Sequence, residues 1–257
     1  MSKLIDKLNQ ASQSAPQPIG FRAVQPASSK PKMLLIAKPT KSDADNLAEY
    51  ISGADGVLLH IPQNPTAKTL QKVSRTIPEI PWGWWLEGNG QRKIERIAKA
   101  GYDFIAFPAT STSLAIPKGD KVGRILQVEA SISEGLLRTV GDLPVDAVLV
   151  TSEREGEYPL TWHHLMLFQR FANLLTKPLL VSIPSNITTG ELQALWDAGV
   201  SGVIVEAETG QPAGKLNGLR QAIDKLTVPS SHKERTGKAL IPHITAETAL
   251  SEEEGEE

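Results

Sequence analysis

Eight short apolar runs that alternate with helix-like segments constrain the fold of this 257-residue chain more than any other feature. Each run has the length of a strand and is rich in β-branched or aromatic residues. The runs read KMLLIAK, GVLLHI, WGWWLE, FIAFPA, ILQVEA, AVLVTSE, LLVSIP and GVIVEAE. Strands that alternate with helices form a parallel sheet with helical crossovers, so the pattern predicts an α/β protein.

A repeat along the chain indicates how the sheet is arranged. The even-numbered runs have similar entries, GADGVLLH, AGYDFIAF, LPVDAVLV and AGVSGVIV, whereas odd-numbered runs are approached through Lys or Pro. A two-strand unit used four times is typical of a closed barrel of eight strands. The alternative is a doubly wound open sheet, which usually carries a Gly-rich loop after its first strand, where this chain reads AKPTKSDAD. We therefore predict a single (β/α)8 TIM barrel.

Composition divides the chain into three parts. Residues 1–31 form a leader, in which Leu4, Ile5 and Leu8 have helical spacing and predict a short helix packed on the body, followed by a Pro/Ser-rich stretch. Residues 32–227 hold the barrel, and 228–257 form a polar, acidic tail that we expect to be solvated and mobile. The connection after the fourth run, TSTSLAIPKGDKV, is too short and broken for a full helix.

Charge and composition exclude several classes of function. The net charge is −2, so the chain lacks the basic excess that nucleic-acid binding requires. No apolar run approaches the roughly 18 residues that span a bilayer. Without cysteine, disulfides and thiolate metal sites are excluded. We expect a cytoplasmic protein with a small-molecule ligand and with no nucleic-acid or membrane partner; a homo-oligomer stays open.

The third run, WGWWLE, shows how strand periodicity sorts side chains between the two faces of the sheet. Trp82 and Trp84 share one face, which we place under the flanking helices. Gly83, Trp85 and Glu87 share the inward face, where Gly83 leaves room, Trp85 fills the middle and Glu87 reaches the end of the strand. We interpret Trp85 as core packing; stacking on a sugar is the alternative.

The same rule applied to the other runs collects polar side chains at the C-terminal end of the barrel, where barrel enzymes have their active sites. The fourth run does not sort, and the face of His60 is undecided. The catalytic candidates are Lys38, Glu129 and Glu153. The ligand-binding candidates are Glu87, Gln127, Thr151, Ser182, Ser185 and Glu206.

Several carboxylates at one end of a barrel cannot all stay ionised and unpaired. They require Lys38, a divalent cation such as Mg²⁺ on oxygen ligands, a cationic or polyhydroxylated ligand, or protonation of one glutamate. The alternative is that single glutamates lie in water and pair with nearby cations. The sequence does not identify a cofactor, because it contains no HExxH, GxSxG, P-loop or GxGxxG motif.

The segment VSIPSNITTGELQALWDAGVSGVIVEAE resembles the last third of phosphate-binding aldolase-type barrels such as indole-glycerol-phosphate synthase and thiamine-phosphate synthase. The resemblance implies that residues 182–187 and 206–210 lie at their phosphate-binding loops. It also implies that Lys38 and Glu129 lie near the strand-1 lysine and strand-5 glutamate of the indole-glycerol-phosphate enzymes. The chain departs from those families at Pro184, which has no N–H to donate, and at Glu206, which would repel a phosphate.

Three functional hypotheses follow. The first is an enzyme that performs lyase, isomerase or hydrolase acid–base chemistry on a small polar or phosphorylated metabolite. The second is a non-catalytic barrel that serves as a binding or scaffold protein. The third is a metal-dependent site built from the glutamates, which requires that their carboxylates converge.

Overall fold

The structure is a computed structural model of the chain. It describes residues 2–12, 31–40, 47–60, 75–77, 80–86, 101–114, 121–151, 159–207 and 214–227. The chain divides into two units, Met1–Thr227 and Val228–Glu257, and all described residues belong to the first. The predicted tail, 228–257, and residues 13–30 of the predicted leader lie outside the described residues.

Eight parallel strands form a closed barrel in chain order, with β1 paired to both β2 and β8. This confirms the predicted (β/α)8 architecture and excludes the open sheet, in which the two edge strands would be unpaired. The strands are β1 (Leu34–Pro39), β2 (Gly56–His60), β3 (Trp82–Trp85), β4 (Phe104–Pro108), β5 (Gly123–Glu129), β6 (Ala147–Thr151), β7 (Leu179–Ile183) and β8 (Gly202–Ala207).

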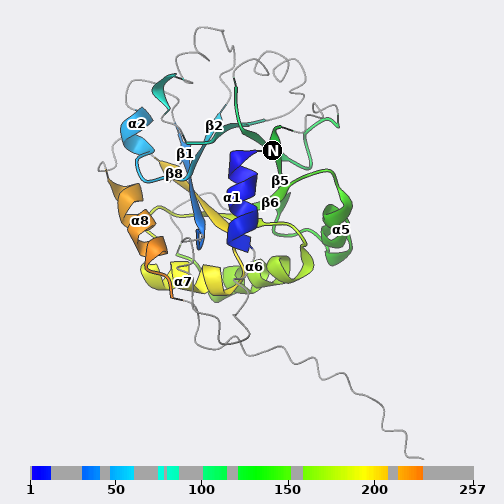
Figure 1. Cartoon of the computed structure of the whole chain (residues 1–257). Helices are drawn as coiled ribbons and strands as arrows, with labels where there is room; N and C mark the ends of the chain where they lie inside the picture. The colour runs from blue at the N-terminus through cyan, green and yellow to red at the C-terminus, as the bar shows by residue number, and fades with distance from the viewer. Residues whose placement is uncertain are drawn as a thin grey trace, which may run out of the picture. The chain divides into compact units, whose positions relative to one another are not determined.

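Helices surround the barrel and one lies across its end (Figure 1). The described residues of the β4–β5 connection, 109–114 and 121–122, contain no helix, and the rest of that connection lies outside the described residues. No helix within the described ranges is long and apolar enough to cross a membrane. The helices are α1 (Lys3–Ser12), α2 (Leu47–Tyr50), α5 (Glu134–Thr139), the 3-10 turn η2 (Val140–Asp142), α6 (Trp162–Leu174), α7 (Thr189–Asp197) and α8 (Lys215–Asp224).

The two faces of the strands bury two separate clusters, and the predicted inward and outward faces are confirmed. Trp82 and Trp84 belong to the cluster between strands and helices, with their rings edge to face at 5.4 Å. The fourth strand, which the pattern did not sort, points Phe104 and Ala106 inward. The strand residues inside the barrel are Leu34, Ile36, Leu58, Phe104, Ala106, Ile125, Ala147, Leu149, Leu180 and Ile204.

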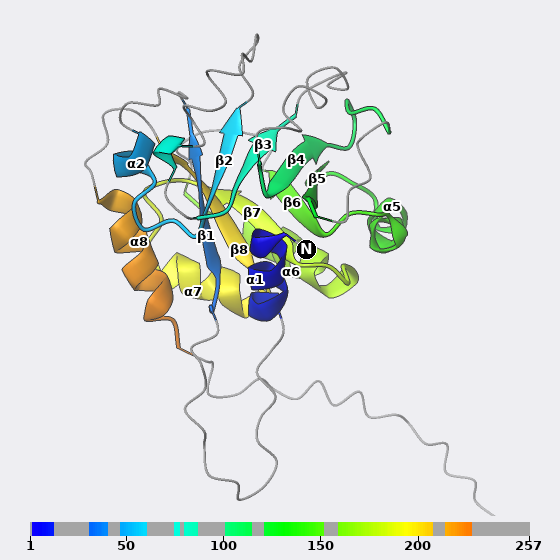
Figure 2. The ribbon, with the colours of Figure 1, turned by 45° about the horizontal axis from the view of Figure 1, so that its top comes forward.

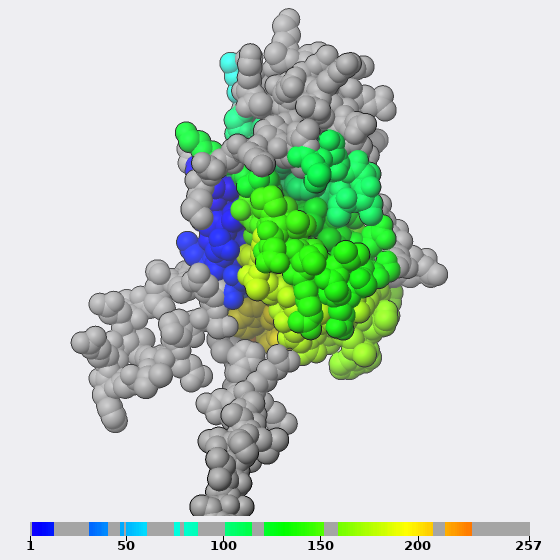
Figure 3. Space-filling view, turned by 90° about the vertical axis from the view of Figure 1, so that its right-hand side faces the viewer, coloured from blue at the N-terminus to red at the C-terminus, as the bar shows by residue number. Residues whose placement is uncertain are grey.

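Helix α1 closes the N-terminal end of the barrel (Figure 2). The predicted apolar face, Leu4, Ile5 and Leu8, is buried and belongs to the interior cluster rather than to the cluster under the outer helices. In the space-filling view α1, in blue, lies against the green and yellow residues of the body (Figure 3). The apolar side chains of α1 therefore fill the N-terminal end of the barrel interior, where larger side chains on the strands would otherwise be needed.

A glycine at the start of a strand leaves space for α1, and an aspartate binds its N-terminus. A Cβ atom on Gly123, at the start of β5, would lie 2.5 Å from Ile5 Cγ1, so only glycine leaves room for the helix there. The Asp103 carboxylate accepts hydrogen bonds from the backbone N–H groups of Lys3 and Leu4 at 2.8 and 2.9 Å and from the hydroxyl of Ser2 at 2.7 Å. A residue from the β3–β4 connection thus caps the N-terminus of α1.

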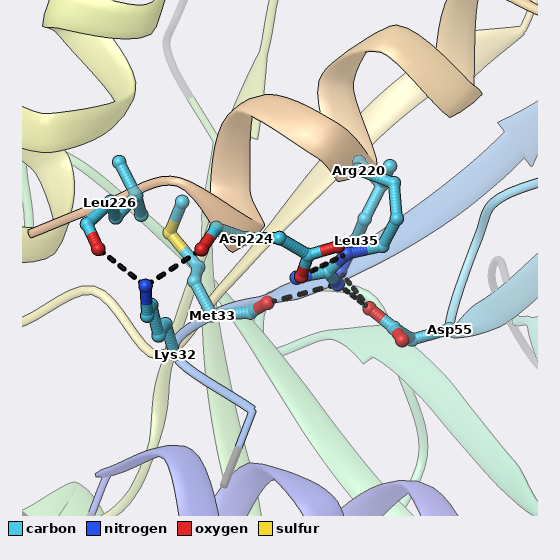
Figure 4. A network of polar contacts seen from close by, with 7 residues as sticks. All are labelled: Lys32, Met33, Leu35, Asp55, Arg220, Asp224 and Leu226. Carbon is cyan, nitrogen blue, oxygen red and sulfur yellow. Dashed lines mark hydrogen bonds and ion pairs between the residues drawn. The ribbon is translucent and has the colours of Figure 1, made fainter. Parts of the chain in front are cut away.

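A polar network joins α8 to the first two strands (Figure 4). The Arg220 guanidinium pairs with Asp55 and, at 2.8 Å, with Asp224, and it donates to the backbone oxygen of Met33 at 3.3 Å. Asp55 also accepts the backbone N–H of Leu35 at 2.9 Å. These contacts lie at the N-terminal ends of the strands, so they join α8 to the barrel at the end opposite the one where barrel enzymes have their active sites.

Candidate functional site

One inward-facing side chain near the C-terminal end of each strand is half-buried, while the inward residues before it are buried. The eight form a ring with one member per strand, at the end of the barrel opposite α1 (Figure 2). We call this set the rim ring. Its members, from β1 to β8, are Lys38, His60, Trp85, Pro108, Gln127, Thr151, Ser182 and Glu206.

Lys38 and Glu206 form the central contact of the rim ring. They face each other in register on β1 and β8, and Lys38 Nζ lies 2.9 Å from Glu206 Oε1. The Lys38 side chain is 15% exposed and that of Glu206 is 39% exposed. Lys38 Nζ also lies 5.6 Å from the centre of the Trp85 ring. An ammonium group is therefore held, partly desolvated, between a carboxylate and an aromatic face.

His60 is the functional candidate that the sequence left undecided. It pairs in register with Trp85, and the two ring centroids lie 6.4 Å apart. The run GVLLH did not show which face of the strand carries His60, because Leu58 and Leu59, which point to opposite faces, are both apolar and both buried. One signal could have found it. His60 is the polar residue at the end of its run, and the runs before and after it were predicted to point Lys38 and Trp85 inward.

The opposite side of the rim ring carries neutral hydrogen-bonding groups. The Gln127 amide donates to the Thr151 hydroxyl at 2.7 Å, and Ser182 follows on β7. Glu129, the last residue of β5, is exposed and accepts a long hydrogen bond from the Ser131 hydroxyl at 3.4 Å. The inward direction predicted for Gln127, Thr151 and Ser182 is confirmed.

Ser185, in the connection after β7, contacts a cation that the sequence did not single out. Lys215, the first residue of α8, donates from Nζ to Ser185 Oγ at 2.9 Å. The contact joins α8 to residues 182–187, one of the two segments that the resemblance to phosphate-binding barrels places at a phosphate-binding loop. The preceding Gly214 has a φ of 101° and caps α8 without a side chain.

The described carboxylates of the site do not converge. Glu206 is paired with Lys38 on β8, whereas Glu129 is exposed on β5. Within the described ranges, no three His, Asp or Glu side chains are grouped so that they could hold a metal ion. The expected convergence of glutamates is therefore not found for this pair, because the strands that carry them are not adjacent. Glu87 and Glu153 lie outside the described residues.

A second feature lies on the outer surface, between α6 and α7. A groove of about 410 Å³ is lined mainly by apolar side chains, including Leu165, Phe168 and Leu195. Trp162 is 82% exposed at its edge, and Met166 is exposed on the same helix. His163 and His164 lie at the N-terminus of α6 rather than at the rim ring.

The closed barrel of eight parallel strands in chain order defines the fold of the chain as a (β/α)8 TIM barrel. Solved structures with this fold include the tryptophan synthase alpha-subunit from Pyrococcus furiosus. One mutant of that subunit is 13% identical, covers 75% of this chain and 97% of its own, and has a TM-score of 0.57. A chain of the tryptophan synthase a2b2 complex from the same organism is also 13% identical, covers 75% of this chain and 97% of its own, and has a TM-score of 0.55. At this identity the likeness extends to the fold alone; no family model and no curated protein matches the chain.

Proposed function

We propose that the chain is an enzyme that performs lyase, isomerase or hydrolase acid–base chemistry on a small polar or phosphorylated metabolite at the rim ring. The observation that carries the proposal is the Lys38–Glu206 contact of 2.9 Å at the C-terminal end of the barrel. Removing the Lys38 ammonium from water costs desolvation energy. The apolar ring of Trp85 lies beside the same ammonium group. Such groups are common where a ligand must be polarised.

The residues divide by role. Lys38 is the electrophilic group, because its ammonium already donates to the Glu206 carboxylate at 2.9 Å, and an ammonium donates hydrogen bonds but does not attack a carbonyl. Glu129 and Glu153 are the acid–base candidates predicted from the sequence, and Glu87, Gln127, Thr151 and Ser182 are the ligand-binding ones. Lys215 beside Ser185 supports an anionic group, such as a phosphate, at the β7 and β8 connections.

A thermal-shift screen tests the proposal. The purified chain is screened against divalent cations, phosphate, sugar phosphates, carboxylic acids and amino acids. A ligand at 100 times its Kd adds about 2.7 kcal/mol of stability, which is a shift of a few degrees. Lys38→Met should abolish the shift, whereas Lys121→Met, at an exposed lysine before the start of β5, should keep it. A shift that survives Lys38→Met would place the ligand elsewhere.

A second candidate function is a non-catalytic barrel that binds a second copy of itself. It is supported by the groove between α6 and α7 and by the exposed Trp162 at its edge, since contiguous exposed apolar surface marks interaction sites. Sedimentation velocity tests it: Trp162→Ser should convert a dimer to a monomer, and Leu136→Ser, at an exposed leucine of α5, should not. A wild-type chain that is monomeric at high concentration would reject this candidate.

A further inference from the structure

The rim ring divides into two sectors of different chemistry. The ionic sector is Glu206, Lys38, His60 and Trp85, on the consecutive strands β8, β1, β2 and β3. The neutral sector is Gln127, Thr151 and Ser182, on β5, β6 and β7, and Pro108 on β4 lies between the two. An eight-stranded barrel is wide enough at its end for one small ligand. A molecule bound across the ring therefore meets charged groups on one side and neutral hydrogen-bonding groups on the other.

We propose that this ring binds a small hydroxy-carbonyl compound, in which a carbonyl carbon is bonded to a hydroxyl-bearing carbon, and moves a proton between those two carbons. In this assignment His60 is the proton acceptor, and Lys38 holds the oxygen on which negative charge develops. The inference rests on the proposed function, because it names the substrate class and reaction of the same site. It adds a catalytic residue, His60, to those predicted from the sequence.

Lys38 suits the developing oxyanion because its ammonium group has hydrogens to spare. Of its three N–H donors, one is used by Glu206, and within the described residues that is its one hydrogen bond. Within the described residues, its other two N–H donors are available to a ligand. A partly desolvated ammonium stabilises an enolate oxygen much more strongly than water does, because the surrounding dielectric is low.

His60 suits the proton acceptor because of its position and its chemistry. It lies on the strand next to Lys38, and both side chains approach the Trp85 ring, at 6.4 Å for the imidazole and 5.6 Å for the ammonium. Imidazole is the side chain that exchanges a proton near neutral pH, and it is the one imidazole of the rim ring. Glu206 is a poorer acceptor because its carboxylate already binds Lys38.

The neutral sector suits the hydroxyl groups of such a substrate. Because the Thr151 oxygen accepts the Gln127 amide at 2.7 Å, its own hydrogen is directed elsewhere and can be donated to a ligand. The Gln127 side-chain carbonyl accepts, and Ser182 can do either. Half-buried groups of this kind discriminate strongly against a ligand that lacks the matching hydroxyl, since they would then be left unpaired.

The reaction balances without a further reactant. The hydroxyl-bearing carbon loses its proton to a nitrogen of His60, its C–H electron pair forms a carbon–carbon double bond, and the carbonyl electron pair moves to oxygen beside Lys38. The imidazolium then returns the proton to the former carbonyl carbon, while the hydroxyl proton passes to the former carbonyl oxygen. The carbonyl group has moved by one carbon, and His60 and Lys38 end in their starting states.

Proton exchange with solvent tests the inference even where little product accumulates. The full chain is incubated in D₂O with dihydroxyacetone, glyceraldehyde, pentoses and hexoses, each free and as its phosphate, and ¹H NMR follows loss of the signal next to the carbonyl. We expect exchange at least 100-fold above buffer for one probe. His60→Gln should reduce it about 100-fold or more and remove the acid limb of its pH profile, and Lys38→Met should reduce it by about 100- to 1,000-fold.

The controls separate this inference from the proposed function. His163→Gln, at a histidine on α6 away from the rim ring, should leave exchange unchanged, and circular dichroism should show that each variant is folded. Absence of exchange with every probe overturns the inference. If a carboxylic or amino acid still gives a thermal shift that Lys38→Met abolishes, the proposed enzyme function stands without it. Exchange that survives His60→Gln and His60→Asn overturns the role of His60.

Discussion

Gly83 faces the barrel interior on β3, where its missing side chain makes room for Phe104. A Cβ atom at this position would lie 2.4 Å from the backbone oxygen of Phe104 and 2.5 Å from its ring. Because the neighbouring strand cannot withdraw, Gly83→Ala should destabilise the fold by about 1–3 kcal/mol, measured by urea unfolding. Gly135→Ala on α5, where no atom lies within 4 Å, should be neutral or stabilising. Equal midpoints for the two variants would contradict this account.

Gly199 ends α7 in a conformation that other residues rarely adopt. Its φ is 93°, its N–H donates to Trp196 at 2.9 Å, and the N–H of Val200 donates to Leu195 at 3.1 Å. Gly199→Ala should lower the free energy of unfolding by about 1–2 kcal/mol, and a Cβ 2.9 Å from that of Ala172 adds to the cost. Thermal unfolding of Gly199→Ala is compared with that of Gly218→Ala, a control at an open position on α8. If Gly199→Ala lost no more stability than Gly218→Ala, the requirement for glycine at position 199 would be contradicted.

At the scale of single residues, strand parity predicted direction but not neighbours. It placed Gly83, Trp85 and Lys38 inward, because alternate residues of a strand share a face, and in a run of mixed polarity only one of the two alternating sets is wholly apolar. It did not predict that Phe104 fills the space beside Gly83 or that Glu206 meets Lys38. Those contacts depend on the register between strands, which is set only when the barrel closes.

At the scale of elements, α6 begins with a cap that depends on pH. The backbone N–H of Thr161 donates to His164 Nδ1 at 3.1 Å, and the Thr161 hydroxyl accepts the backbone N–H of His164 at 3.4 Å. Burial lowers the pKa of His164 below its usual 6.5, and the charge of His163 lowers it further. The folded state therefore binds fewer protons, so this stabilisation is complete above pH 6.5 and is lost as the pH falls through the lowered pKa.

Thermal unfolding between pH 7.5 and 5 should accordingly show a loss of stability that His164→Gln removes, since a glutamine at this position still closes the capping box but does not titrate. His163→Gln should shift the loss to a higher pH, because His164 then protonates more easily. A pH dependence identical in the wild type and in His164→Gln would assign the loss to other groups.

Helix α1 shows where an element can be predicted and its place cannot. The spacing of Leu4, Ile5 and Leu8 predicted a short amphipathic helix that packs on the body. That it closes the barrel depends on Gly56, Gly123 and Gly202, at the starts of three strands far apart in the sequence, and on Asp103. Only the closed barrel brings these residues together.

At the scale of the whole molecule, the alternation of apolar runs and helices predicted the architecture because a parallel barrel requires that order. The two sectors of the rim ring were not predicted, because they arise from the closure of β8 onto β1 and from a histidine at the end of a uniformly apolar run. The rim ring and α1 lie at opposite ends of the barrel.

The two ends should respond independently to mutation. Leu8 is fully buried in the interior cluster, so Leu8→Ala should lower the free energy of unfolding by about 2–5 kcal/mol. Lys38→Met leaves Glu206 unpaired, but that side chain is 39% exposed and water replaces its partner, so the loss should stay within about 1 kcal/mol. Because α1 and the rim ring lie at opposite ends of the barrel, the double variant should be additive to within about 0.5 kcal/mol in urea unfolding. Ligand-induced thermal shift should be retained by Leu8→Ala and lost by Lys38→Met; coupling above 1 kcal/mol between the two substitutions would show that α1 and the rim ring act as one unit.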